Sequence, residues 1–286
     1  MNLTTEDRIL REFILKSLAE DLGDGDHTSL ACIPPDAKGK AKLIIKETGI
    51  LAGIRVATVL FSTVDKDLQL NVLLRDGASV IPGDIAFYLS GNQQSILKSE
   101  RLVLNIMQRM SGIATSTNQY VAQIKGLKTR ILDTRKTTPG FRFLEKEAVR
   151  IGGGINHRMG LFDMILIKDN HIDYAGGVEN AIHKTQEYLR KNNLKLKVEI
   201  EARSLPDVRT IISADGIDRI MLDNFSIEET IQAVKEISGR YETESSGGID
   251  LTNIRAYAEC GVDFISAGAL THHVKSLDMS LKAVSQ

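Results

Sequence analysis

Ionisable side chains and glycines follow six short apolar segments in the second half of the chain. The groups are, in order, Thr134-Arg135-Lys136-Thr137-Thr138, Lys168-Asp169-Asn170-His171, Glu199 with Glu201, Asp223-Asn224, Glu244-Ser245-Ser246-Gly247-Gly248 and Gly268-Ala269-Leu270-Thr271-His272. In an α/β barrel the carboxyl ends of the strands share one face, and the active site lies there. If the six segments are parallel strands, the sequence predicts one cavity where these groups meet.

Cationic side chains near these tips are suited to an anionic substrate. They are Arg135, Lys136, His157, Arg158 and Lys168, in a chain with a formal net charge of only -1. Arginine presents a planar fork that fits a carboxylate or a phosphate, and lysine presents a compact charge for phosphate oxygens. Taken singly, such residues are most often solvated surface charges. As two adjacent pairs and a lysine, they predict an anion site.

Two loops of small residues predict a phosphate site. Ser245-Ser246-Gly247-Gly248 precedes a helix expected to begin near Leu251, and Gly268-Ala269-Leu270-Thr271 follows the next strand. Small residues let backbone N–H groups approach a phosphate, and phosphate-binding barrels carry such loops after their last two strands. Either loop alone would also suit an ordinary turn. Gly152-Gly153-Gly154 is not a dinucleotide fingerprint, because no strand leads into it.

Glu201 and Asp223 are acids that could hold a hard cation or ribose hydroxyl groups. Mg²⁺ prefers oxygen ligands shared between carboxylates and substrate phosphates. The chain has no HExxH motif and no Cys/His cluster, which argues against a zinc site.

The third apolar segment carries charge on one face. In a strand, Leu196, Val198 and Ile200 would share one side, while Lys197, Glu199 and Glu201 would share the other. A parallel strand buried on both sides is normally apolar throughout. The charged face therefore predicts a strand that lines a wet or ligand-filled cavity, and a solvated edge strand is the alternative.

The elements that must position these tips alternate between strand and helix after about Lys128. The expected strands are Thr129–Asp133, Met164–Ile167, Leu196–Glu201, Arg219–Leu222, Tyr241–Thr243 and Phe264–Ala267. Helix-length amphipathic segments lie between most of them, as at Gly177–Arg190, Ile227–Ile237 and Thr252–Glu259. Such alternation predicts a parallel sheet with crossover helices, either open or closed into a barrel.

The first part of the chain has a different pattern. An amphipathic helix is expected over Thr4–Leu22, then strands near 41–45, 68–73 and 85–89 around a helix at 52–63. A long helix follows from Ser99 toward Ile124, with a polar stripe at Arg101, Asn105 and Gln108. By spacing alone, this stripe is a solvated helix face.

Composition indicates a globular metabolic protein. The chain has 286 residues, 42% hydrophobic and 26% charged, without a block of basic residues, which argues against nucleic-acid and anionic-membrane partners. Cys32 and Cys260 are too few for a disulfide framework. No signal peptide is visible and no apolar run approaches the ~20 residues of a membrane span, so we expect a cytoplasmic location.

Together, these motifs resemble the quinolinate phosphoribosyltransferase family, also called carboxylating nicotinate-nucleotide pyrophosphorylases. The resemblance covers nearly the whole chain. Its motifs are Glu20–Thr28, Glu100–Asn105, Ser111–Thr115, Asp133–Thr137, Gly152–Arg158, Ile167–His171, Leu222–Phe225, Ser245–Ile249 and Gly268–His272. Only Tyr241-Glu242-Thr243 is more polar than the pattern suggests.

The resemblance implies an α/β protein with an amino-terminal α+β sandwich domain at 1–112 and an incomplete, about six-stranded α/β barrel at 113–286. A last helix would pack back on the first domain. It also implies a homodimer or larger assembly, in which Arg101 reaches the neighbouring subunit's site.

The resemblance also implies roles for the site residues. Arg135, His157, Arg158 and Lys168 would hold the two carboxylates of quinolinate. Lys136, Glu201 and Asp223 would hold phosphoribosyl pyrophosphate and its Mg²⁺, directly, through water or through the substrate. Ser246, Gly247, Gly268 and His272 would border the phosphates, and Lys136, Lys168, Glu201 and Asp223 form the implied catalytic set.

The implied reaction is phosphoribosyl transfer to quinolinate with decarboxylation, which gives nicotinate mononucleotide, pyrophosphate and CO₂ in NAD biosynthesis. Positioning and a fixed electrostatic field would carry it, without a side-chain nucleophile. Three alternatives remain at this point: a paralogous phosphoribosyltransferase that does not decarboxylate, a Schiff-base phosphosugar aldolase using Lys136 or Lys168, and a non-catalytic phosphosugar-binding protein.

Overall fold

Two compact units make up the computed structural model, which describes residues 5–284. The first unit contains the residues up to Thr115 together with those from Val274 onward, and the second runs from Ser116 to His273. The expected boundary at 112 lies close to this division, which falls inside the long helix α4 (Gln93–Gln123). Within the part of the chain that the structure describes, no helix is both long and apolar enough to cross a membrane.

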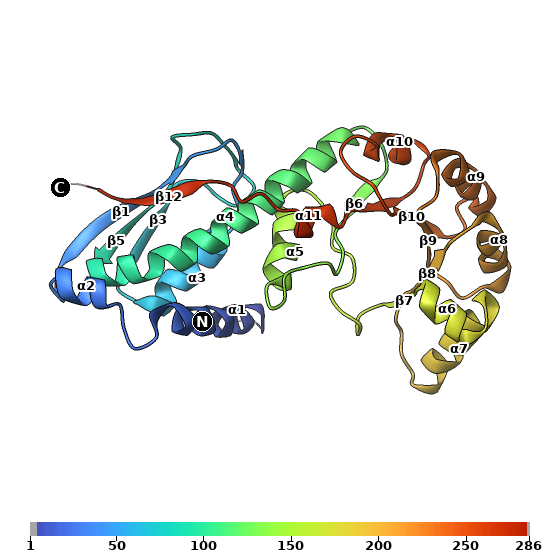
Figure 1. The fold of residues 1–286 in the computed structure, drawn as a ribbon, viewed down its shortest axis with the longest axis horizontal. Coiled ribbons are helices and arrows are strands. Elements are labelled where there is room, and N and C mark those ends of the chain that lie inside the picture. The colour runs from blue at the N-terminus through green and yellow to red at the C-terminus, as the bar shows by residue number, and fades with distance from the viewer. Residues whose placement is uncertain (1–4, 285–286) are drawn as a thin grey trace. The chain divides into compact units, whose positions relative to one another are not determined.

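The first unit is a helical layer packed on an antiparallel sheet of order β12-β1-β5-β3 (Figure 1). The strands are β1 (Lys38–Ile45), β3 (Gln69–Val72), β5 (Ile85–Asn92) and β12 (Met279–Ala283), with a separate pair β2 (Gly49–Ile50) and β4 (Ser79–Val80). The helices are α1 (Thr5–Leu22), α2 (His27–Cys32), α3 (Ile54–Val64) and the first part of α4. Phe61 of α3 meets Phe87 of β5 edge to face, with ring centroids 5.7 Å apart. The expected α+β sandwich is therefore present.

The end of the chain differs from the expected last helix. Residues Met279–Ala283 form strand β12, which runs antiparallel to β1 with Met279 opposite Ile45 and Ala283 opposite Ala41. The physical reason is the two-residue period, since Met279 and Leu281 are buried while the residue between them is half-buried. The segment does return to the first unit, but through strand pairing.

The second unit is an incomplete barrel built on a six-stranded parallel sheet of order β6-β11-β10-β9-β8-β7. The strands are β6 (Arg130–Leu132), β7 (Ile165–Ile167), β8 (Val198–Ala202), β9 (Arg219–Asp223), β10 (Glu242–Ser246) and β11 (Phe264–Ser266). No ladder joins β6 to β7 among the described residues, so the sheet does not close. All six predicted strands exist, and the predicted fold class is confirmed.

Helices connect these strands and cover the outside of the sheet (Figure 1). They are α5 (Arg142–Ile151), α6 (Asp169–Ala175), α7 (Val178–Lys191), α8 (Leu205–Ala214), α9 (Ile227–Ile237), α10 (Ile254–Glu259) and the single turn α11 (Ala269–His272). Each parallel pair needs such a crossover. The carboxyl ends of the six strands consequently lie at one end of the unit.

Candidate active site

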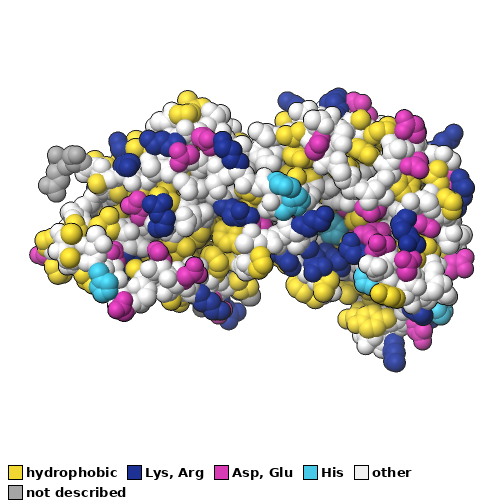
Figure 2. All heavy atoms as spheres, viewed as in Figure 1, with side chains coloured by type: hydrophobic (Ala, Val, Ile, Leu, Met, Phe, Trp, Pro, Cys, Tyr) yellow, Lys and Arg dark blue, Asp and Glu magenta, His cyan; other side chains and the backbone are white. Residues whose placement is uncertain are grey.

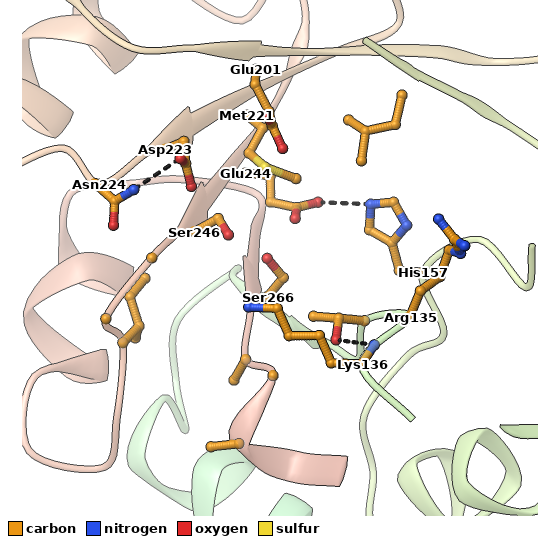
Figure 3. Close-up of a pocket in the computed structure, with 18 of the residues that line it drawn as sticks. Arg135, Lys136, His157, Glu201, Met221, Asp223, Asn224, Glu244, Ser246 and Ser266 are labelled. Atoms are coloured by element: carbon orange, nitrogen blue, oxygen red, sulfur yellow. Dashed lines mark hydrogen bonds and ion pairs between the residues drawn. The ribbon is translucent and has the colours of Figure 1, made fainter. Parts of the chain in front are cut away.

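A cavity of about 860 Å³ opens at the carboxyl ends of the six strands, entirely within the second unit. Figure 2 shows Lys and Arg side chains beside Asp and Glu side chains on this unit, and Figure 3 shows the labelled side chains converging on the cavity. It is lined by the predicted residues Arg135, Lys136, His157, Arg158, Lys168, Glu201, Asp223, Ser246, Gly247, Gly268 and His272. The single shared cavity that the sequence predicts is therefore present.

Arg101 is the predicted site residue that does not line this cavity. It is exposed on α4, in the first unit. Its role in the site of a second subunit stays a prediction, because the cavity of one subunit does not include it.

Two arginines, Arg135 and Arg158, form a cationic wall on one side of the cavity. The Arg158 side chain is largely buried, and one guanidinium nitrogen donates to the carbonyl of Met164 at 3.1 Å. Burial, and then the charge of Arg135, lower the pKa of Arg158. The buried Nε of Arg135 has no hydrogen-bond partner among the described residues. Two cations held close together with donors to spare favour a multiply charged anion between them.

The acids lie on the neighbouring strands β8 and β9. Glu201 accepts an ion-paired hydrogen bond from Lys168 Nζ and a second hydrogen bond from the N–H of Asp169 at 3.1 Å. Asp223 accepts a hydrogen bond from Asn224 Nδ2 at 2.8 Å. Burial, and then the negative charge of Glu201, raise the pKa of Asp223. A carboxylate crowded by another favours binding of a cation.

His157 is held at both ring nitrogens. Its Nε2 lies 2.8 Å from Glu199 Oε2, and its Nδ1 accepts the backbone N–H of Arg158 at 2.7 Å. The accepting role of Nδ1 places the ring proton on Nε2, so the imidazole is neutral. Burial also lowers the pKa of His157. His157 thus forms a fixed, uncharged wall of the cavity.

The peptide of His157 is held by a buried ion pair that sequence analysis missed. Asp133, at the end of β6, accepts the His157 N–H at 2.9 Å, and Lys146 of α5 donates to the His157 carbonyl at 3.0 Å. Asp133 and Lys146 are themselves ion-paired, with side chains 0% and 1% exposed. Residues 156–158 have no regular secondary structure, so this pair is what positions them.

A second buried network lies under the cavity floor and includes residues that sequence analysis did not single out as site residues. Arg219 of β9 donates to Glu244 Oε2 at 3.0 Å and stacks on the Phe264 ring at 4.0 Å. Burial and then the charge of Glu199 raise the pKa of Glu244 to about 8, while burial raises the pKa of Glu199 to about 7. Only Glu244 of this group reaches the cavity together with His157.

The missed signal was the two-residue period of β10. The expected strand ended at Thr243, which left Glu244 in a loop, but β10 continues to Ser246 and pairs Glu244 with Met221 of β9. Likewise, the charged face of β8 does not uniformly line a cavity. Glu199 is fully buried beneath the cavity, and of the two glutamates only Glu201 faces the cavity.

The cluster of His157, Glu199 and Glu244 places possible ligand atoms within 4.8 Å of one another. However, the His157 ring is hydrogen-bonded to Glu199, and the guanidinium of Arg219 lies 3.0 Å from Glu244. Arg219 supplies the positive charge that a metal ion would bring. The predicted cation ligands, Glu201 and Asp223, lie apart from this cluster and line the cavity, where Glu201 is paired with Lys168.

The small-residue loop after β10 differs in one respect from the expectation. Helix α10 begins at Ile254, with Asn253 at its cap, and not near Leu251. A turn intervenes because the carboxylate of Asp250 accepts the N–H of Thr252 at 2.8 Å. Gly247 has a φ of +95°, and a Cβ there would lie 2.1 Å from Asn224 Oδ1. The loop therefore presents its backbone to the cavity, and the start of α10 lies further along the chain.

The loop after β11 also faces the cavity through its backbone. A Cβ on Gly268 would meet His272 Nε2 at 2.9 Å and Lys136 Cδ at 3.1 Å. The hydroxyl of Thr271 donates to the Lys136 carbonyl at 2.8 Å. This contact joins the loops after β11 and β6, and so fixes Lys136 beside Gly268.

Comparison with known proteins gives the following matches. Residues 113–282 match the model of the quinolinate phosphoribosyl transferase C-terminal domain, and residues 26–111 match that of its N-terminal domain. The chain is 46% identical to the chloroplastic nicotinate-nucleotide pyrophosphorylase [carboxylating] of Arabidopsis thaliana, over 96% of this chain and 82% of the relative. It is 38% identical to a probable nicotinate-nucleotide pyrophosphorylase [carboxylating] of Synechocystis, over 96% and 93%.

Solved structures agree over the full length. NadC from Streptococcus pyogenes superposes with a TM-score of 0.92 at 37% identity, covering 100% of both chains. The nicotinate-nucleotide pyrophosphorylase of Francisella tularensis superposes with a TM-score of 0.90 at 41% identity, over 99% of this chain and 98% of that one.

Proposed function

Because the chain belongs to the quinolinate phosphoribosyltransferase family, we propose that it transfers phosphoribosyl from phosphoribosyl pyrophosphate to quinolinate. The products are nicotinate mononucleotide, pyrophosphate and CO₂. The observation that carries this proposal is the single cavity that combines arginines for carboxylates, acids for a cation and two small-residue loops for phosphates.

The residues divide by the chemistry of the two substrates. Arg135, Arg158 and Lys168 bind the carboxylates of quinolinate, and His157 forms the wall beside them. Lys136, Ser246, Gly247, Gly268 and His272 border the phosphates of phosphoribosyl pyrophosphate. Bringing two reactants into one geometry supplies much of the rate, and fixed positive charge stabilises the leaving pyrophosphate.

An assay with the two substrates tests the function. We expect equal amounts of nicotinate mononucleotide, pyrophosphate and CO₂. A phosphoribosyltransferase without decarboxylation would release no CO₂, an aldolase would form a borohydride-trapped lysine adduct with a phosphosugar, and a binding protein would show no turnover.

Glu201 and Asp223 fit a magnesium ion that arrives with the substrate, since their oxygen donors face the cavity and the pKa of Asp223 is raised beside Glu201. When bound, the ion neutralises charge on the departing pyrophosphate. Removal of divalent ions with EDTA is expected to abolish turnover, and added Mg²⁺ to restore it. In Asp223→Asn, the Mg²⁺ concentration for half-maximal rate is expected to rise about tenfold. Full activity in EDTA would contradict the assignment.

Gly247→Ala is expected to weaken the use of phosphoribosyl pyrophosphate. The new Cβ would lie 2.1 Å from Asn224 Oδ1 and 3.0 Å from its backbone nitrogen, so the loop must shift. We expect KM for phosphoribosyl pyrophosphate to rise roughly 5- to 150-fold, as for a loss of about 1–3 kcal/mol. Gly248→Ala is the control, because its φ is +60° but its Cβ would meet nothing within 4 Å. Equal effects of the two variants would show that backbone strain alone is responsible.

We propose further that the enzyme is a homodimer or larger assembly in which Arg101 completes the neighbouring site. Arg101→Ala and Lys168→Ala are each expected to have little activity. Mixed one to one with subunit exchange, they should recover about a quarter of wild-type activity, because half of the dimers are mixed and each has one intact site of two. No recovery after verified exchange would contradict the shared site.

A cytoplasmic location stays a prediction, which cell fractionation tests.

A further inference from the structure

The carboxyl group of Glu244 lies at the floor of the cavity with one oxygen uncommitted. The residue is 0% exposed, yet it lines the cavity. Its Oε2 accepts a hydrogen bond from Arg219 and lies 3.6 Å from His157 Nε2, toward which it points in Figure 3. Its Oε1 has no hydrogen-bond partner among the described residues. Oε1 of the neighbouring Glu199 also has no partner among the described residues, but of the two carboxyls only Glu244 lines the cavity, so only its oxygen is within reach of a ligand there.

The surroundings favour one proton on the two buried carboxyls, Glu199 and Glu244. Arg219 is the cation between them, and it also pairs with Glu242 at 3.1 Å. The facing His157 is neutral, and Ser266 on the other side carries no charge. Two carboxylates this close cannot both be ionised at low cost. A bound dicarboxylate would add negative charge nearby and make double ionisation less favourable still.

The proton belongs on Glu244. Glu199 Oε2 accepts the N–H of His157 at 2.8 Å, which suits an ionised carboxylate. Glu199 does not line the cavity, whereas Glu244 does. Burial and the charge of Glu199 raise the pKa of Glu244 to about 8, consistent with a protonated carboxyl at neutral pH.

We propose that Glu244 is the acid that protonates the ring carbon after decarboxylation, an inference that rests on the proposed function. When the bond to the departing carboxylate breaks, its electron pair stays on the ring carbon beside the positively charged ring nitrogen, and CO₂ is released. The Glu244 O–H bond then breaks, and its proton forms the new C–H bond. Glu244 becomes a carboxylate paired with Arg219, and a proton from solvent restores it. Without this step, CO₂ can recombine with the carbanion.

Other side chains of the cavity are less suited to this step. Lys168 is ion-paired with Glu201, and its charge is needed to bind the substrate. The nitrogens of His157 are both engaged, one with Glu199 and one with the Arg158 N–H. Glu244 combines a proton to give, an unpartnered oxygen and a neighbouring arginine to stabilise the product carboxylate.

A single-turnover experiment separates transfer from decarboxylation. Quinolinate labelled in the carboxyl group that is lost and phosphoribosyl pyrophosphate are mixed with excess enzyme, and pyrophosphate and CO₂ are measured over time. For Glu244→Gln we expect pyrophosphate release within about threefold of wild type and CO₂ release slowed by about 100-fold. The quinolinate nucleotide, in which the ribose is attached but the carboxylate has not yet left, should accumulate in the quenched reaction.

Glu242→Gln is the matched control, because Glu242 lies on the same strand and pairs with the same Arg219 but does not line the cavity. In Glu242→Gln, pyrophosphate and CO₂ should be released at equal rates. Should Glu244→Gln fail to fold, Glu244→Asp keeps a carboxyl group but withdraws it from the substrate, and the same separation is expected.

Equal slowing of both products, no slowing, or the same separation in Glu242→Gln would overturn the proposal. If the wild-type enzyme itself releases neither product, the proposed function fails instead, which distinguishes the two.

Discussion

Lys146→Met is expected to lower the free energy of unfolding by about 3–5 kcal/mol. The Lys146 side chain is 1% exposed and pairs with that of Asp133, which is 0% exposed. Burial lowers the pKa of Lys146 and raises that of Asp133, so each charge depends on the other. Removal of the lysine leaves a buried carboxylate without its cation. Urea unfolding monitored by circular dichroism measures the change.

Two further variants test whether the loss comes from the uncompensated charge. Lys128→Met removes the lysine of the exposed pair Lys128–Asp263, whose lysine side chain is 65% exposed, and should cost less than about 1 kcal/mol. Adding Asp133→Asn to Lys146→Met should recover part of the loss, because the remaining charge is removed. A loss below that of Lys128→Met would show that the buried pair contributes no more than a surface pair.

The Lys146–Asp133 pair also has a consequence for the site. It holds the N–H and the carbonyl of His157, and Arg158 follows directly in the chain. Buried ion pairs are seldom retained for stability, because apolar residues can replace them without loss. We infer that this pair is retained because it holds an irregular segment in the one conformation that points Arg158 into the cavity.

Arg158→Lys is expected to raise KM for quinolinate about 10- to 100-fold, as for the loss of a charged hydrogen bond worth 1.5–3 kcal/mol. One nitrogen of Arg158 is committed to the Met164 carbonyl at 3.1 Å, and the rest of the fork is free to bind a carboxylate. Lysine has one nitrogen and cannot do both. Steady-state kinetics with varied quinolinate measures the effect, and KM for phosphoribosyl pyrophosphate should change little.

Arg142→Lys is the control for this substitution. Arg142 also donates to a backbone carbonyl, that of Met159 at 3.1 Å, but it does not line the cavity. Its quinolinate KM should stay within about twofold of wild type. An unchanged KM in Arg158→Lys, or an equal rise in both variants, would rule out carboxylate binding by Arg158.

Local sequence determined the elements of the second unit well. Apolar segments such as those at β7 and β9 have the length and composition of buried parallel strands, and the helix at Ile227–Ile237 matches its predicted bounds. Because parallel strands joined by crossover helices all point the same way, the polar tips had to meet. This is why residues from Arg135 to His272 could be assigned to one cavity.

Pairing partners and burial were decided by the tertiary structure alone. Nothing local to Lys146 or Asp133 marks them as a buried pair, and Arg219 reads as an ordinary surface charge at the start of a strand. Glu244 became a cavity residue because β10 pairs with β9 as far as Ser246. Residues Met279–Ala283 became a strand because one edge of β1 was open to pairing, and in the resulting register Met279 and Leu281 lie opposite Ile45 and Leu43. Period and composition specify which elements form, but the desolvation of a charge depends on which distant groups the fold brings against it.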